Sequence, residues 1–197
     1  NASWFIYSAA LNTYILTITG SAQQVGFASF IYSLPGALFM LHAGLLTDRY
    51  GAKRLVVISL VGSGIAIILI GVLALQVAPI AILVALGFVM GVFQTLGSPA
   101  FISIVNDLVP PKAVSSAVAL TFLGFNVGRI LGGVLGGLLL VVFGTDVLVA
   151  APVAIVVAGV LQAVPAIPVA AIRVKERVAR TTGRAMFRPL LETAGYV

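Results

Sequence analysis

Four polar side chains lie inside otherwise apolar runs of this chain, where they could bind a ligand. Arg129 is the only cation in such a run, and Asn12, Gln94 and Asn126 are neutral hydrogen-bonding groups. A guanidinium in an apolar segment is costly unless it faces a cavity, a carboxylate or backbone carbonyls. We therefore expect Arg129 either to line a central cavity, where it binds an anionic group or tunes a proton site, or to brace helices through carbonyls or Asn126. The three amides could hydrogen-bond a substrate, and bonding between helices is the alternative.

A charged turn between two long apolar runs is the second candidate site. It extends from Gly44 to Arg54, in a chain with only 8% charged residues. Gly44 would let another helix approach closely, and Gly51 would permit a tight reversal. Asp48 is a fixed negative charge at the membrane edge, able to meet a helix N-terminus or a neighbouring guanidinium. The bases of the turn can anchor to lipid headgroups or pair with Asp48, and they are Arg49, Lys53 and Arg54. A simple topogenic turn is the alternative.

Glycines recur at every fourth residue along a further apolar run. This spacing places residues on one face of a helix, where they form a smooth groove for the backbone of another helix. The glycines are Gly124, Gly128, Gly132 and Gly136, with Gly133 and Gly137 beside them. We expect a helix-packing face here, although packing of small residues occurs in many membrane proteins.

The composition excludes several classes of protein. Hydrophobic residues make up 61% of the 197 residues, and the mean hydropathy is +1.21, so a soluble domain of this size could not bury so much apolar surface. The chain has no cysteine, one histidine and five acids, which leaves little for a metal cage or an acid–base pair. An intramembrane enzyme would depend on His42 as its imidazole base. We therefore expect no enzyme activity, no metal and no cofactor.

The apolar runs predict the elements that position these residues. Runs at 25–46, 55–75, 80–105, 113–142 and 147–170 are long enough to span a bilayer, given about 20 residues per span. A sixth run, from Trp4 to Thr19, is shorter, and because the chain begins with Asn rather than Met we expect this helix to be truncated. The expected fold is an all-α membrane protein with six transmembrane helices over residues 1–172. Residues 173–197 would be a basic linker, either with an amphipathic helix on the membrane surface or solvated throughout.

The charges in the loops predict the orientation of the bundle. Loops near 20–24, 76–79 and 143–146 have no basic residue, whereas the loops near 47–54 and 106–112 and the tail hold ten of the 11 Lys and Arg residues. Basic loops stay in the cytoplasm, so we expect these loops and the tail on the cytoplasmic side of the plasma (cell inner) membrane. The same distribution argues against a nucleic-acid partner, despite a net charge of +6.

Four stretches of the sequence resemble motifs of one known protein family. The turn from Gly44 to Arg54 resembles the signature loop of the major facilitator superfamily, G-x-L-a-D-r-x-G-r-[KR], and it lies in the same place, between the second and third helices. Gly128 through Gly137 is similar to the antiporter motif of that family, with Gly133 where a proline is expected. Asp107–Pro110 and Phe125–Arg129 resemble the enterobactin-exporter-like branch, also called transmembrane secretion effectors, although Phe101 replaces an arginine of that branch.

The resemblance implies half of a larger fold. Such an N-terminal half consists of two inverted three-helix repeats, with substrate bound near the midplane between the halves, and Asp48 would act as a latch between them. The resemblance therefore predicts a secondary active transporter that exports a small amphipathic molecule, drug-like or siderophore-like, driven by protons. The lipid bilayer and a C-terminal six-helix half missing from this chain would be its partners. A non-transporting scaffold, or an accessory half that pairs with another subunit, is the alternative.

Overall fold

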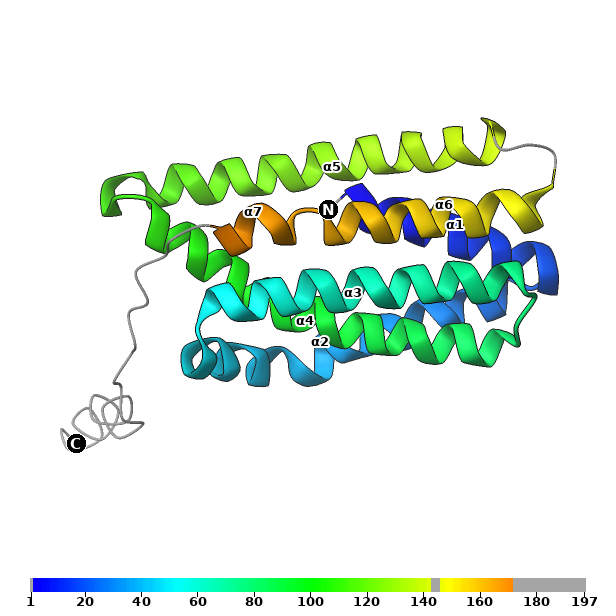
Figure 1. The fold of residues 1–197 in the computed structure, drawn as a ribbon, viewed down its shortest axis with the longest axis horizontal. Coiled ribbons are helices and arrows are strands. Elements are labelled where there is room, and N and C mark those ends of the chain that lie inside the picture. Colours follow the sequence, from blue (N-terminus) through cyan, green and yellow to red (C-terminus); the bar gives the residue numbers. More distant parts are fainter. Residues whose placement is uncertain (1, 143–145, 172–197) are drawn as a thin grey trace, which may run out of the picture.

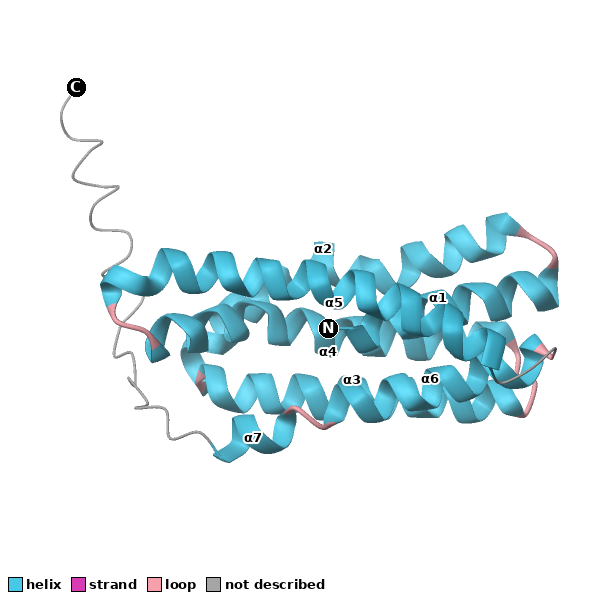
Figure 2. Ribbon diagram, turned by 90° about the horizontal axis from the view of Figure 1, so that it is seen from above, coloured by secondary structure: helices cyan, strands magenta, loops and turns pink. Residues whose placement is uncertain are grey.

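The computed structural model describes residues 2–142 and 146–171, and within these ranges all regular structure is helical (Figures 1 and 2). The elements are α1 (Ala2–Thr19), α2 (Ala22–Tyr50), α3 (Ala52–Leu75), α4 (Ile80–Leu108), the short 3₁₀ turn η1 (Pro111–Ala113), α5 (Val114–Val142), α6 (Val147–Ala163) and α7 (Ala166–Ala171). Five stretches are long and apolar enough to cross a membrane, namely α2, α3, α4, α5 and the stretch from α6 through α7. The predicted all-α membrane fold with six long helices is confirmed.

Short turns reverse the chain at both ends of the bundle. Gly20 and Gly51 have positive φ angles of 62° and 87°, which L side chains rarely adopt. The Asp146 side chain caps α6 by accepting a hydrogen bond from the Leu148 N–H at 2.9 Å. The sequence indicated a longer charged loop between these helices. In the structure Gly51 alone separates α2 from α3, so Asp48 lies in the last turn of α2.

The helices form an open arc. Their extensive contacts run in the order α2, α4, α3, α6, α1, α5, so that α2 and α5 lie at opposite edges (Figure 1). Exchanging α1 with α4, α2 with α5 and α3 with α6 maps this set of contacts onto itself. For example, α2 against α4 becomes α5 against α1, and α3 against α4 becomes α6 against α1. This pattern is the one expected of two inverted three-helix repeats.

Where the two repeats meet, α3 and α6 approach each other at backbone distance. A Cβ atom at Gly64 would lie 3.0 Å from the Gly159 carbonyl oxygen, and one at Gly159 would lie 2.9 Å from the Gly64 carbonyl oxygen. A Cβ atom at Gly71 would lie 2.9 Å from the Pro152 carbonyl oxygen. These distances are too short for a side chain, so glycine is required at all three positions. We call Gly64, Gly71 and Gly159 the α3–α6 seam.

The buried core lies among α1, α3, α4 and α6. It includes Tyr7, Tyr14, Ile67 and Ile155, all fully buried. The Tyr14 hydroxyl donates a hydrogen bond to the Ala74 carbonyl at 2.7 Å and so ties α1 to the end of α3. In contrast, α2 and α5 leave many large apolar side chains exposed, as expected of surfaces that face lipid or an apolar partner.

The apolar run predicted at residues 147–170 contains a break in the helix. α6 ends at Ala163 and α7 begins at Ala166. Pro165, between them, has no N–H to donate to the carbonyl four residues earlier, so regular helical hydrogen bonding is interrupted there. The linker predicted at 173–197 lies outside the described residues.

Candidate functional site

A cavity of about 700 Å³ lies in the half of the bundle that ends in the α2–α3 and α4–α5 turns. Six helices contribute to its walls: the start of α1, the first turns of α3, the second half of α4, the first half of α5, the end of α6, and α7. Three of the four polar residues predicted to line a cavity are brought together here, namely Gln94, Asn126 and Arg129.

Arg129 provides the positive charge of this cavity. It lies one turn beyond Asn126 on α5, so both side chains share a face of the helix. The Asn126 Nδ2 group donates to the Phe122 carbonyl at 2.9 Å, within its own helix, and does not brace Arg129. Asp48 and Asp146 are the acidic side chains whose surroundings the structure describes, and both lie at helix ends. A ligand anion could therefore meet the Arg129 guanidinium without displacing either of these carboxylates.

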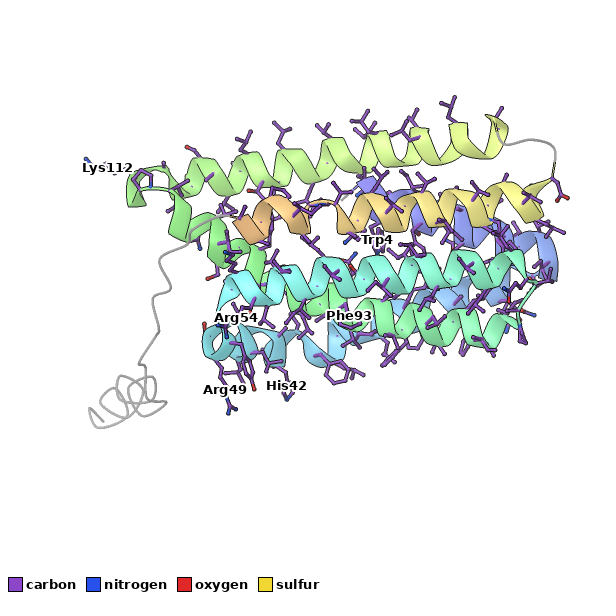
Figure 3. All side chains as sticks on the ribbon, in the orientation of Figure 1. Trp4, His42, Arg49, Arg54, Phe93 and Lys112 are labelled. Carbon is purple, nitrogen blue, oxygen red and sulfur yellow. The ribbon has the colours of Figure 1, made fainter. Side chains whose placement is uncertain are left out.

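Aromatic side chains form much of the remaining wall. Phe125 lies edge-on to Phe101 with ring centroids 6.4 Å apart, which links α5 to α4. Trp4 and Phe5, at the start of α1, are in edge-to-face contact at 5.0 Å. Figure 3 shows Trp4 near the middle of the bundle. A cationic group beside aromatic walls suits an amphipathic anion, whose apolar part packs on the rings.

A series of buried hydrogen bonds that the sequence did not predict lies beside the cavity. The Ser3 hydroxyl donates to Gln162 Oε1 at 2.5 Å, and Gln162 Nε2 donates to Ser63 Oγ at 3.2 Å. The Ser63 hydroxyl in turn donates to the Ser59 carbonyl at 2.6 Å. We call this set the Ser3–Gln162–Ser63 chain, and it connects α1, α6 and α3. A glutamine in an otherwise apolar run was the one signal that pointed to it.

Asn12 does not join the other three predicted residues. It lies on α1, where its Oδ1 is 3.5 Å from the Tyr32 hydroxyl of α2, and the same hydroxyl is 2.8 Å from Ser29 Oγ. The nearby Tyr7 hydroxyl is buried and has no hydrogen-bond partner among the described residues. Asn12 therefore belongs to a tyrosine cluster between α1 and α2, outside the cavity lining.

The charged turn lies at one end of the bundle. Figure 3 shows Arg49, Arg54 and Lys112 at this same end. Asp48 and Arg54 are exposed, and the Arg49 guanidinium lies over the Tyr50 ring, 5.5 Å from its centroid. Lys53 is half-buried. A Cβ atom at Gly44 would meet nothing within 4 Å among the described residues, so this part of α2 is open to a further helix.

The glycines of α5 divide between two surroundings. A Cβ atom at Gly132 would lie 2.5 Å from the Ala2 carbonyl oxygen, and one at Gly136 would lie 3.4 Å from the Ile6 Cα, so both pack on α1. Within the described part of the chain, Gly124, Gly133 and Gly137 have open space where a Cβ would lie. Gly128 is half-buried. We call Gly133 and Gly137, which lie one turn apart on the same side of the helix, the open α5 face.

His42, the imidazole base that an intramembrane enzyme would require, lies outside the cavity lining. It lies on α2 beside Phe39, with ring centroids 6.5 Å apart. In the ranges 2–142 and 146–171, no three His, Cys, Asp or Glu side chains gather in a way that could hold a metal ion.

Comparison with known proteins identifies relatives over most of the chain. The staphyloferrin A transporter of Staphylococcus aureus is 25% identical over 141 residues, which are 71% of this chain and 36% of that protein. The enterobactin exporter EntS of Shigella flexneri is 30% identical over 142 residues, 71% of this chain and 34% of the exporter. EntS of Salmonella typhimurium is 30% identical over 138 residues, 68% of this chain and 33% of the exporter. No solved structure gave a significant match.

The matched stretch is about a third of each relative's own length. The sequence pattern of the Major Facilitator Superfamily matches residues 1–193, nearly the whole chain. Together with six long helices in two inverted repeats, this match supports one assignment. The chain belongs to the major facilitator superfamily.

Proposed function

We propose that this chain is the N-terminal half of a secondary active transporter that exports a small amphipathic anion, siderophore-like or drug-like, and is driven by the proton gradient. The observation that carries the proposal is the cavity that Arg129 lines together with aromatic side chains and the amides of Gln94 and Asn126. Siderophore transport by the named relatives is consistent with a substrate of this kind. Apolar walls lower the effective dielectric around a guanidinium, which strengthens its attraction for an anion even though the Arg129 side chain is exposed.

Transport would follow from rocking of this half against a second six-helix half. The inverted repeats described above are the architecture that supports such movement around a fixed site near the midplane. Asp48 would latch the two halves on one side of the membrane, because it is exposed at the end of α2 close to the open position at Gly44. A negative charge there can pair with the positive N-terminus of a helix or with a guanidinium of the second half.

Proton coupling would depend on groups outside the described spans. Asp48 and Asp146 lie at helix ends, and neither is near the bilayer midplane. We therefore place the carboxylate that exchanges protons in the second half. It would interact electrostatically with the guanidinium of Arg129 in this chain.

The basic end of the bundle would face the cytoplasm. Arg49, Arg54 and Lys112 share that end in Figure 3, and basic residues beside spans are retained on the cytoplasmic side. The protein would then lie in the plasma (cell inner) membrane, with the basic tail from residue 173 also cytoplasmic.

A non-transporting accessory half is the second candidate. The exposed apolar side chains on α2 and α5 and the open α5 face would suit pairing with another subunit as well as with a second half of the same transporter. The two candidates differ in whether the cavity is used, so a transport assay separates them.

The test is proton-driven uptake into inverted membrane vesicles that contain the complete transporter. The amphipathic anion anilinonaphthalene sulfonate serves as the probe, and an acidic vesicle interior supplies the driving force. We expect accumulation of the probe that an uncoupler abolishes. Accumulation that survives the uncoupler would rule out proton coupling, and uptake equal to that of empty vesicles would favour the accessory half.

A further inference from the structure

The Ser3–Gln162–Ser63 chain combines deep burial with a place in the cavity wall. Ser3, Ser63 and Gln162 are 5%, 0% and 3% exposed. Ser3 and Gln162 nevertheless line the cavity, together with Ser59 from the next turn of α3. Polar groups so deep in an apolar bundle are costly unless they are hydrogen-bonded, and each of these is bonded to another helix or to its own.

The hydrogen bonds leave part of the Gln162 amide unused. A glutamine amide has two N–H donors and two oxygen lone pairs. The Gln162 amide donates one of its N–H groups to Ser63, and one lone pair of its oxygen accepts the hydrogen bond from Ser3. One N–H and one lone pair have no partner among the described residues, and this pair of functions matches a neutral group that both accepts and donates, such as a hydroxyl or an amide.

The neighbours of Gln162 hold it in one orientation before any ligand arrives. Ser3 and Ser63 come from α1 and α3 and bond to opposite ends of the same amide group. A Cβ atom at Gly64 would lie 2.9 Å from the Ala163 Cβ, so the last turn of α6 packs closely against α3 beside this amide. A group held in this way loses little conformational freedom on binding, which favours recognition.

We propose that Gln162 is a specificity-determining residue, which recognises a hydroxyl or amide of the substrate while Arg129 binds the anionic group. The inference rests on the proposed function, since it assumes that the cavity holds the substrate. The substrate class is then narrowed to amphipathic anions that also have a neutral hydrogen-bonding group. Ser63 and Ser3 position the amide and do not themselves need to touch the ligand.

The test compares two probes that differ by one hydroxyl, hydroxyphenylpropionate and phenylpropionate, by calorimetric titration of the complete transporter in lipid nanodiscs. We expect the wild-type protein to bind the hydroxylated probe about tenfold more tightly, the usual size of one net hydrogen bond. Gln162→Met, which keeps the length of the side chain, should remove this preference and leave the affinity for phenylpropionate unchanged. Arg129→Ala should weaken binding of both probes equally.

A second variant covers the case in which Gln162→Met does not fold. Ser63→Ala leaves Gln162 in place and removes its orienting partner, so the preference should fall while phenylpropionate binds as before. Gln76→Met, in the exposed turn between α3 and α4, is the matched control and should change neither affinity.

The outcomes separate the two proposals. Failure of the wild-type protein to bind either probe would overturn the proposed function and this inference with it. An unchanged preference in Gln162→Met or in Ser63→Ala, with both probes weakened by Arg129→Ala, would overturn the role of Gln162 alone.

Discussion

The α3–α6 seam and the open α5 face both depend on glycine, yet their glycines have different surroundings. At the seam, a Cβ atom at Gly64 or at Gly159 would lie 3.0 Å or less from the carbonyl oxygen of the other glycine, so no side chain fits. On the open face, Gly133 and Gly137 meet no described atom where a Cβ would lie. The seam joins the two repeats within this half. The open face has no neighbour in the described structure, and we propose that it packs on the second half.

The difference shows what glycine spacing can and cannot reveal. A regular spacing of four residues marks one face of α5, and the face divides between contact with α1 and open space. The seam has no such regularity, because Gly159 is a lone glycine whose partners lie on a helix distant in sequence. Close backbone approach is a property of two helices together, so the pattern along one of them does not report it.

The largest effect is expected from Gly159→Leu at the seam. A Cβ atom there would already lie 2.6 Å from the Ile68 side chain and 2.9 Å from a backbone oxygen, so leucine should force α3 and α6 apart. We expect destabilisation of at least about 3 kcal/mol, the upper end for overpacked cores. Thermal unfolding of the complete transporter in detergent measures it. Gly133→Leu, with open space at its Cβ, is the matched control and should leave this half folded. Equal destabilisation by both variants would contradict the proposed difference between the seam and the open face.

Arg129→Ala should produce the next largest effect, and on binding only. The residue is exposed and lines the cavity, so its loss should not destabilise the bundle. Removal of a charged hydrogen bond to an anion should lower affinity by about 10- to 100-fold. Titration with anilinonaphthalene sulfonate measures the change. Arg129→Lys should retain part of the affinity, because the charge remains while the planar fork is lost. An unchanged affinity for the anion in Arg129→Ala would contradict the proposed anion site.

Asp48→Asn should have a smaller effect, confined to transport. Because Asp48 is exposed at the end of α2, its neutralisation should leave the unfolding temperature of the protein unchanged. Loss of an interaction worth about 1 kcal/mol with a helix terminus of the second half should slow vesicle uptake several-fold. Arg54→Gln, in the same turn and also exposed, tests whether any charge change there has this effect. Transport at the wild-type rate in Asp48→Asn would contradict the latch.

The smallest effect should come from Gly137→Ala on the open face. With nothing within 4 Å of its Cβ, alanine should fit, and a helical interior gains up to about 1 kcal/mol when alanine replaces glycine. Gly64→Ala at the seam should do the reverse, since its Cβ would lie 2.9 Å from that of Ala163. Unfolding curves of the two variants should therefore shift in opposite directions, and shifts in the same direction would contradict the assignment of the two surroundings.

Much of the fold could be predicted from the sequence, because a bilayer imposes strong limits on span length and loop charge. The predicted run at 55–75 corresponds to α3, and the run at 113–142 to α5, within a few residues. The break at 164–165 was missed because Val164 and Pro165 continue the apolar pattern. The reversal at Gly51 is tighter than the charge pattern indicated, since helix ends follow backbone geometry and not polarity.

The candidate site was less predictable. The sequence singled out Arg129, Asn126 and Gln94, which share the cavity, but it also singled out Asn12, which lies in the tyrosine cluster. Polarity within an apolar run marks a residue as unusual without stating which helix it faces. Gln162 was missed for the complementary reason: its partners Ser3 and Ser63 are small, common residues, and only packing brings the three together.

The most direct measurement is protection of a cavity thiol from a water-soluble maleimide. This chain has no cysteine, so each of two substitutions introduces a single thiol into it. Ser98→Cys lies in the cavity wall, and its matched control Ser116→Cys is exposed near the start of α5, outside the wall. In the complete transporter, we predict that anilinonaphthalene sulfonate slows labelling at position 98 and leaves position 116 unaffected. Addition of Arg129→Ala should abolish the protection. A labelling rate at position 98 that the anion does not change would contradict a substrate site built around Arg129. Protection that persists in the presence of Arg129→Ala would contradict it as well.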